Sequence, residues 1–200
     1  MKKFGIFLEF KIKENNLINK IKSLFLSRIS GKSYYLLEKP HLTIYTFNTF
    51  SSISVISDIF RKSFKKLTFK KINYSKFKIF KNDLFTRSDT FVLLIKKEPK
   101  LLKLQRKIYY YFKKHFYFER KDINLFKKNK GITLNYKKYC FPYYGKIWLP
   151  HITIGSFNYI KNKDHILNLQ DTNIQKNFEI HSITLNLISK TRTIKILACK

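Results

Sequence analysis

The chain has 200 residues, of which 44% are hydrophobic and 27% charged, and a formal net charge of +30. This length and apolar content suit a single two-lobed domain over residues 1–200 with a core of its own. The apolar runs fall short of the roughly 18 residues that a membrane span needs, and we expect no signal peptide. Cys140 and Cys199 have neither disulfide nor metal spacing. We therefore expect no membrane association and a monomer in the cytoplasm, or in the host cytoplasm if the gene is viral.

The charge admits two interpretations. Lys and Arg number 42 against 12 Asp and Glu, which is typical of proteins that bind polyanions such as RNA. The chain is also rich in Lys, Ile, Asn and Phe, and Ala198 is its only alanine, as expected of an A+T-rich gene. The lysines therefore indicate either capture of a nucleic acid or a solvated, lysine-coated surface.

The first half of the chain alternates strands and helices. Residues 3–10 have the period of a strand, and Asn15 or Asn16 is a candidate cap for the helix that follows. A strand is predicted over 41–47, then a helix capped by Ser51 or Ser52. Two further strands are predicted around 77–79 and 91–95, followed by a helix that begins at Pro99.

The second half is more irregular. Residues 119–144 suggest loops with one weak strand at 132–136. A strand from 151, a short helix at 164–169 and strands at 178–187 and 193–198 complete the pattern. The element order predicts an α+β fold with rough internal symmetry, built either as two antiparallel sheets or as one split sheet, with flanking helices.

One pentapeptide pattern occurs twice. Pro40-His41-Leu42-Thr43-Ile44 and Pro150-His151-Ile152-Thr153-Ile154 each run on through two residues to a phenylalanine, Phe47 or Phe157. On a strand, the His and Thr of each unit project to the same side, roughly 7 Å apart. The aliphatic residues point to the other side, so each His-Thr face is free to line a cleft.

Two imidazoles and two hydroxyls that converge on one space could bind and cleave a phosphoester. A neutral histidine can take a proton while a protonated one gives a proton to the leaving oxygen. Threonine hydroxyls can donate hydrogen bonds to the non-bridging phosphate oxygens. This chemistry requires no metal and no cofactor. His115, His165 and His181 lack ligand spacing, and we interpret them as structural.

The two motifs and the order of elements around them resemble the two-histidine (2H) phosphoesterase superfamily, which includes RNA 2′-5′ ligase-like and cyclic-nucleotide phosphodiesterase proteins. The resemblance spans nearly the whole chain. It implies a bilobed fold with pseudo-two-fold symmetry and a central cleft. It also implies metal-independent hydrolysis of 2′-linked or 2′,3′-cyclic phosphates in RNA or nucleotides, with catalytic roles for His41, Thr43, His151 and Thr153.

Substrate contacts are less well marked. Many relatives have an arginine soon after the second motif, where this chain has Gly155-Ser156, so Lys146, Lys190 or Arg192 could supply that phosphate contact. The aromatic residues nearest to the motifs are candidates for a base-stacking platform. They are Tyr34, Tyr35, Tyr143, Tyr144 and Trp148.

Two other functions stay open. The same cleft could hydrolyse 2′-5′-linked immune messengers, such as a 2′-5′ oligoadenylate or a cyclic dinucleotide like 2′,3′-cGAMP. A protein of another class, a non-catalytic RNA-binding protein, would use the basic surface alone, although binding by itself does not need two matched acid-base groups.

Overall fold

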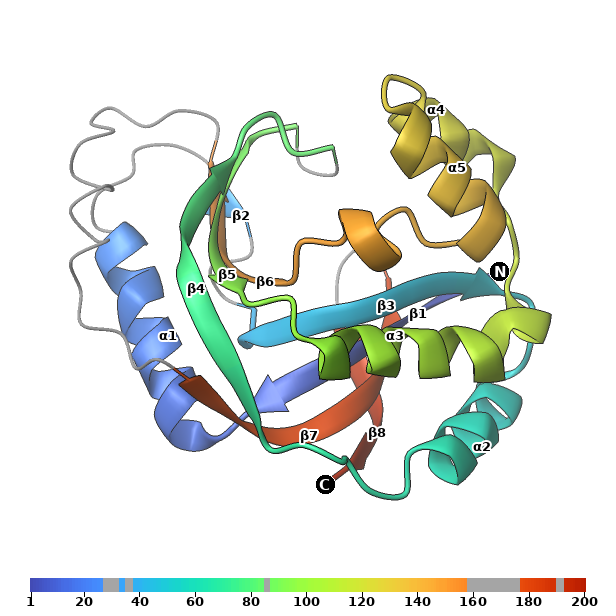
Figure 1. Cartoon of the computed structure of the whole chain (residues 1–200), viewed down its shortest axis with the longest axis horizontal. Coiled ribbons are helices and arrows are strands. Elements are labelled where there is room, and N and C mark those ends of the chain that lie inside the picture. The colour runs from blue at the N-terminus through green and yellow to red at the C-terminus, as the bar shows by residue number, and fades with distance from the viewer. Residues whose placement is uncertain (27–32, 35–37, 85–86, 158–176, 190–192) are drawn as a thin grey trace.

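The structure is a computed structural model that describes residues 1–26, 33–34, 38–84, 87–157, 177–189 and 193–200 (Figure 1). The strands are β1 (Lys2–Phe10), β2 (Ser33–Tyr34), β3 (His41–Thr49), β4 (Lys71–Phe80), β5 (Asp89–Ile95), β6 (His151–Phe157), β7 (Asn177–Ile188) and β8 (Thr193–Cys199). The α-helices are α1 (Ile12–Leu26), α2 (Ile53–Ser63), α3 (Pro99–Phe112), α4 (Ile123–Phe126) and α5 (Lys130–Tyr139).

Within the described residues the strands pair in the order β1-β3-β6-β5-β4-β7-β8, with β2 beside β6 and a further pairing between β1 and β7. Every pairing is antiparallel. The strands divide into two four-stranded halves, β3-β1-β7-β8 and β2-β6-β5-β4. The halves join where Leu42 pairs with Ile152 and where β4 pairs with the start of β7. The predicted α+β architecture of antiparallel strands is thus confirmed, and these two contacts join the halves into one split sheet.

The two halves repeat one another around the His-X-Thr strands. In the β1–β3 pairing the register shifts at Ile44, and in the β5–β6 pairing it shifts at Ile154, the same position of the repeated motif. A bulge of this kind bends a strand and redirects its side chains. Because both motifs carry it, both strands curve in the same way beside their histidine and threonine.

Each motif strand is also covered by its own helix. The ring of Phe47 on β3 lies 5.4 Å from that of Phe112 on α3. The ring of Phe157 on β6 lies 5.4 Å from that of Phe25 on α1. The repeated phenylalanine that follows each motif therefore anchors the strand to a helix, and the buried aliphatic residues of the motif complete the same core.

Several predicted element boundaries are confirmed. The Ser52 side chain accepts a hydrogen bond from the Val55 backbone N–H at the start of α2, and Pro99 lies in the first turn of α3. The predicted helix α1 is present, but its predicted cap is wrong, since the helix begins at Ile12 and both candidate caps lie inside it. The Asn15 amide instead donates to the Phe10 carbonyl, which ties the first turn to the end of β1.

The strand predicted over 132–136 is also wrong, because these residues belong to α5. The Asn129 side chain caps this helix by accepting from the Ile132 backbone N–H. Tyr136 lies one turn further on, and its hydroxyl donates to Asp122. A cap and a buried tyrosine one turn apart thus outweigh the β-branched residues of this stretch. The short helix predicted at 164–169 lies outside the described residues.

Among the residues that the structure describes, no helix is long and apolar enough to cross a membrane.

Candidate active site

The two His-X-Thr units meet at their central residues. Leu42 and Ile152 are direct antiparallel partners, and both are fully buried. Antiparallel pairing at this point places His41 on the side of Thr153 and His151 on the side of Thr43. Adjacent strands lie about 5 Å apart and alternate residues about 7 Å apart, so the four side chains outline a patch roughly the size of a phosphate group.

Both imidazoles have the same hydrogen-bonding arrangement. Nδ1 of His41 lies 2.9 Å from the carbonyl oxygen of Lys39, and Nδ1 of His151 lies 2.8 Å from that of Leu149. A carbonyl only accepts, so each Nδ1 carries the hydrogen and donates it. Nε2 is therefore the nitrogen of each ring that is left to take up or release a proton, as acid-base chemistry requires.

Burial lowers the pKa of both histidines, because an apolar environment disfavours the charged ring. The backbone hydrogen bond at each Nδ1 opposes this shift. The surrounding charges differ, since Lys22 and His151 lower the pKa of His41 and Glu9 raises it, whereas Asp83 raises the pKa of His151. The environment of His151 is thus the more favourable of the two for a protonated ring.

An aromatic ring contacts each imidazole. Phe7 from β1 stacks on His41 with ring centroids 4.2 Å apart, and Phe80 at the end of β4 meets His151 edge to face at 4.9 Å. These contacts limit the rotation of the imidazoles and contribute to their burial. Both imidazoles are therefore held in fixed orientations at the cleft.

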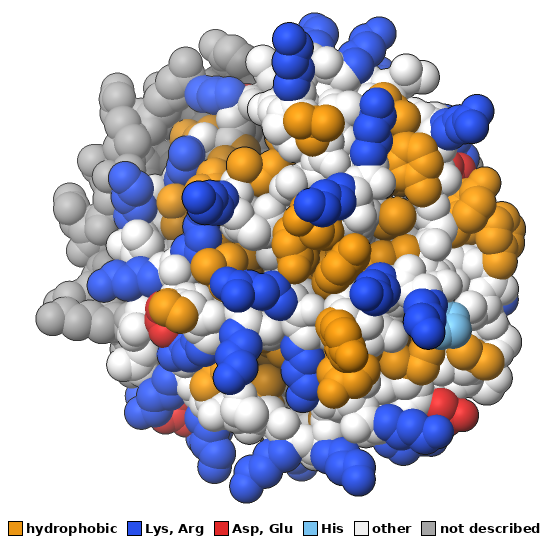
Figure 2. All heavy atoms as spheres, turned by 45° about the vertical axis from the view of Figure 1, so that its right-hand side comes forward, with side chains coloured by type: hydrophobic (Ala, Val, Ile, Leu, Met, Phe, Trp, Pro, Cys, Tyr) orange, Lys and Arg blue, Asp and Glu red, His pale blue; other side chains and the backbone are white. Residues whose placement is uncertain are grey.

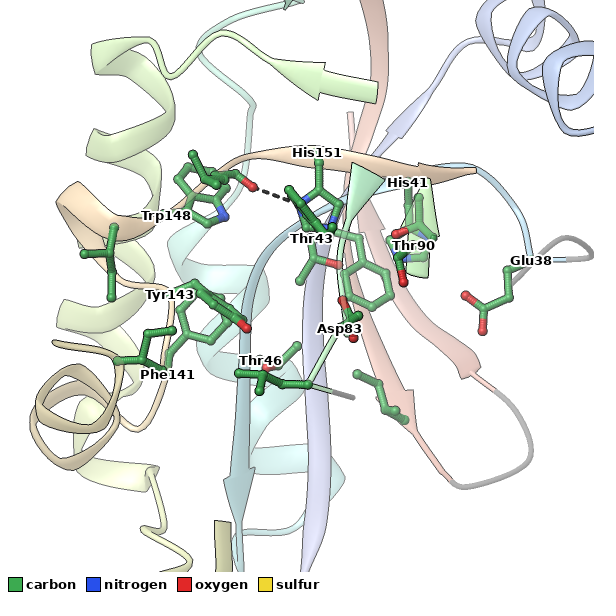
Figure 3. A pocket seen from close by; sticks show the side chains of 18 of the residues that line it. Glu38, His41, Thr43, Thr46, Asp83, Thr90, Phe141, Tyr143, Trp148 and His151 are labelled. Carbon is green, nitrogen blue, oxygen red and sulfur yellow. Dashed lines mark hydrogen bonds between the residues drawn. The ribbon is translucent and has the colours of Figure 1, made fainter. Parts of the chain in front are cut away.

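The cleft has a volume of about 580 Å³, which falls in the range of small-molecule and nucleotide sites. His41, Thr43, His151 and Thr153 all line it. Figure 3 shows the two histidines and Thr43 close together, with Phe141, Tyr143 and Trp148 along a separate wall. The cleft therefore combines a polar floor of acid-base and hydroxyl groups with an aromatic wall.

The charge in the cleft is mixed but mainly positive. Four lysines and two carboxylates line it, namely Lys3, Lys22, Lys39, Lys81, Glu38 and Asp83. Lys22 is 4% exposed, and its ammonium donates to the Glu38 carbonyl oxygen at 2.6 Å. Burial lowers the pKa of Lys22 to about 8, although the Glu38 carboxylate opposes this effect. A cation near His41 suits an anionic ligand.

A buried glutamine joins the first motif to the aromatic wall. Gln105 on α3 is fully buried, and its amide donates to the carbonyl oxygens of Ile44 at 3.2 Å and Tyr143 at 3.1 Å. Its own carbonyl accepts from the Gly145 backbone N–H at 2.8 Å. One side chain thus fixes the bulge of β3 relative to the loop that carries Tyr143.

The region just after the second motif is occupied by a small polar contact. Ser156 is fully buried, and its hydroxyl lies 3.0 Å from that of Thr90, a residue that lines the cleft. Just after the second motif the chain therefore has two packed hydroxyls.

Only some of the other predicted substrate-contact residues line the cleft. Tyr143 and Trp148 line the cleft, whereas Tyr144 and Lys146 do not, and Lys146 is solvent-exposed. Tyr144 instead stacks on Tyr139. The remaining candidates, Tyr35, Lys190 and Arg192, lie outside the described residues, and so does the side chain of Tyr34.

The other histidines differ in their surroundings. His115 lies with its Nδ1 3.0 Å from the Ser51 hydroxyl, and His181 is exposed on β7. His165 is not among the described residues. Across the described ranges, no group of three or more His, Cys, Asp and Glu side chains is placed to hold a metal ion.

Sequence reasoning missed Phe7, Lys22, Asp83, Thr90 and Gln105. Lys22 had a detectable signal, because it follows Ile18 by one turn and adjoins Ile21 on the apolar stripe of α1. Gln105 likewise lies on the stripe of α3 beside Leu104. Strand pairing and turns bring Phe7, Asp83 and Thr90 to the cleft. These long-range contacts leave no periodic pattern in the sequence.

Compared by sequence, the chain matches no protein-family model and no curated protein. Solved structures do match. One described as a phosphoesterase aligns over 100% of this chain and 98% of its own, with a TM-score of 0.51 and 10% identity. E. coli LigT, solved with NADP+, aligns over 100% of this chain and 95% of its own, with a TM-score of 0.52 and 11% identity.

The chain therefore has the same fold as this phosphoesterase and E. coli LigT.

Proposed function

We propose that the protein is a metal-independent phosphodiesterase that hydrolyses 2′-linked or 2′,3′-cyclic phosphates in RNA or nucleotides, with residues 1–200 acting as one two-lobed domain. The pairing of Leu42 with Ile152 carries this proposal, because it brings both His-X-Thr units to one cleft. Two imidazoles with equivalent Nδ1 hydrogen bonds leave two Nε2 atoms for proton transfer.

In the proposed reaction the neutral histidine takes a proton from a water molecule as its oxygen attacks phosphorus. The protonated histidine gives its proton to the 2′ or 3′ oxygen as the bond from that oxygen to phosphorus breaks. Thr43 and Thr153 donate hydrogen bonds to the non-bridging oxygens, which stabilises the charge that builds there. We assign the acid role to His151, because Asp83 favours its charged form, whereas at His41 the effect of Glu9 is opposed by Lys22 and by His151 itself.

The remainder of the cleft suits a nucleotide. Tyr143 and Trp148 offer ring surfaces for a base, and Lys22 and Lys39 offer positive charge for phosphate. The LigT structure with the same fold was solved with the dinucleotide NADP+. These features support a nucleotide or RNA substrate.

The decisive experiment incubates the purified protein with a panel of phosphodiesters and resolves the products by chromatography. The panel contains 2′,3′-cyclic mononucleotides, 2′-5′ and 3′-5′ oligonucleotides, and cyclic dinucleotides with one 2′-5′ bond. We expect turnover only where a 2′-linked or 2′,3′-cyclic phosphate is present. Cleavage restricted to 3′-5′ bonds, or no cleavage at all, would reject the proposal, and cleavage of only the 2′-5′ messengers would narrow it to those substrates.

A further inference from the structure

A cluster of tyrosines lies between α3 and α5, outside the cleft. Tyr139 stacks on Tyr144 with ring centroids 3.9 Å apart, and Tyr109 lies 5.2 Å from Tyr139 and 5.6 Å from Tyr144. All three side chains are half-buried, so part of each remains open to solvent. Rings in this position can stack with further flat groups.

Positive charge flanks this cluster. The ammonium of Lys138 lies over the Tyr139 ring, 5.3 Å from its centroid. The Arg106 guanidinium lowers the pKa of Tyr144, although burial and the neighbouring tyrosines raise it on balance. Further along α3, Lys113 lies over the ring of the exposed Tyr110. Aromatic rings beside cations are the combination with which proteins bind single-stranded nucleic acids.

The region around this cluster is more basic than the chain as a whole. Residues 99–146 contain fourteen Lys and Arg but only two acidic residues, Glu119 and Asp122. Both carboxylates already have partners, since Glu119 pairs with Lys121 and Asp122 accepts from Tyr136. Figure 2 shows lysines and arginines interleaved with hydrophobic side chains over this face. The surface is therefore complementary to a polyanion.

The cluster begins one residue after the cleft wall. Tyr144 follows directly on Tyr143, which lines the cleft wall, and the ring of Tyr144 also lies 6.3 Å from that of the buried Tyr45. A strand with its phosphate at the two histidines and a base against Tyr143 could continue over Tyr144, Tyr139 and Tyr109.

We propose that Tyr109, Tyr139 and Tyr144, with Arg106 and Lys138, form a binding site for single-stranded RNA that extends the substrate contacts beyond the cleft. This site, here called the tyrosine site, deepens the proposed function and rests on it for the direction of the strand. The bases of the bound RNA stack on the tyrosines, and its phosphates pair with Arg106 and Lys138. It predicts that the natural substrate is an oligonucleotide rather than a mononucleotide.

The test measures binding and turnover separately. Binding of fluorescent 2′-O-methyl oligouridines of 2, 6 and 12 nucleotides is followed by anisotropy, because these ligands lack the 2′-hydroxyl and stay intact. Turnover is measured on a 2′,3′-cyclic mononucleotide. The variants are Arg106→Gln/Lys138→Gln and Tyr139→Leu. The matched control is Lys13→Gln/Lys20→Gln, which removes two exposed charges from α1 on another side of the molecule (Figure 1).

We expect the wild type to bind the 12-mer more tightly than the dimer. Both tyrosine-site variants should lose about tenfold in 12-mer affinity, since each stacked base and phosphate contact contributes at this scale. Dimer binding and mononucleotide turnover should stay unchanged, and the control should lose less than about twofold. Equal loss in the control, or equal binding of dimer and 12-mer by the wild type, would overturn the site. Absence of turnover in the wild type would instead reject the proposed function.

Discussion

The Phe7 ring stacks on the His41 ring, with centroids 4.2 Å apart and planes inclined by 21°. Phe7 belongs to the neighbouring strand, where it pairs with Thr43 of the same motif. One residue of β1 thus covers the imidazole and lies beside the threonine. Gly5 makes this possible, because a Cβ at that position would lie 2.5 Å from the Phe7 ring.

Replacing Gly5 by alanine should therefore displace Phe7 and release His41. We expect Gly5→Ala to lower kcat/KM about tenfold through misplacement of the imidazole and to lower stability by about 1–3 kcal/mol through overpacking. Hydrolysis rates and thermal unfolding measure the two effects. Gly131→Ala in α5 is the matched control, since its Cβ would meet only the Asn129 side chain at 3.5 Å. Equal hydrolysis rates and equal thermal stability in the two variants would show that the stack of Phe7 on His41 contributes to neither property.

Removing either histidine should nearly abolish turnover. We expect His41→Ala and His151→Ala each to lower kcat by at least about a hundredfold, because a positioned acid or base contributes that much. Circular dichroism should show that both variants remain folded, and EDTA should leave the wild-type rate unchanged. Full activity in both variants, or complete loss with the chelator, contradicts the proposed mechanism.

The pH profile should be shifted to the acid side. The pKa of both histidines lies below the ordinary value of 6.5, mainly because burial disfavours the charged ring. One ring must be neutral and the other protonated, so we expect the optimum of kcat/KM to lie below pH 6.5. A bell-shaped curve centred above pH 7 would rule this out.

The stability of the protein should also depend on pH through His41 and His151. Below about pH 6.5 the unfolded chain binds more protons than the folded protein, because the folded histidines resist protonation. The free energy of unfolding should therefore fall as the pH drops through 6.5 and below. When the free energy of unfolding is measured by urea denaturation at several pH values, it should depend less steeply on pH in His41→Gln and His151→Gln than in the wild type. An unchanged pH dependence in both variants would mean that other titratable groups determine it.

Lys22 should bind anions at the expense of stability. We expect Lys22→Met to weaken sulfate binding, measured by calorimetry, and to raise the free energy of unfolding at pH 7 by about 1 kcal/mol, because burying a charge is unfavourable. Wild-type sulfate affinity should fall as the pH rises through about 8, where Lys22 loses its proton. Lys20→Met, on the exposed face of the same helix, should change neither property. Sulfate affinity independent of Lys22 would exclude this role.

Gln105 should matter for stability and for the aromatic wall together. Gln105→Met keeps the volume but leaves the Ile44 and Tyr143 carbonyls and the Gly145 N–H without this partner. We expect a loss of about 2–4 kcal/mol in unfolding free energy and a higher KM with a smaller change in kcat. A near-neutral effect on unfolding would show that these backbone groups find other partners.

Repetition made the core of the site predictable. The two copies of Pro-His-aliphatic-Thr-Ile gave the strands, the inward and outward faces and the candidate residues, because side-chain direction on a strand follows from its period of two. The α5 helix was missed because Ile132 and Thr133 favour a strand locally. The Asn129 cap and the contact of Tyr136 with Asp122 decided otherwise.

The sequence by itself determined the two motifs, the antiparallel α+β pattern and the kind of chemistry that two histidines and two threonines can perform. Only the tertiary structure decided that Leu42 pairs with Ile152, that Phe7 covers His41, and that Lys22 rather than Lys146 lines the cleft. The physical reason is the range of the interactions. Strand period and helix caps act between near neighbours, whereas strand pairing, burial and the pKa shifts it causes depend on residues that folding brings together.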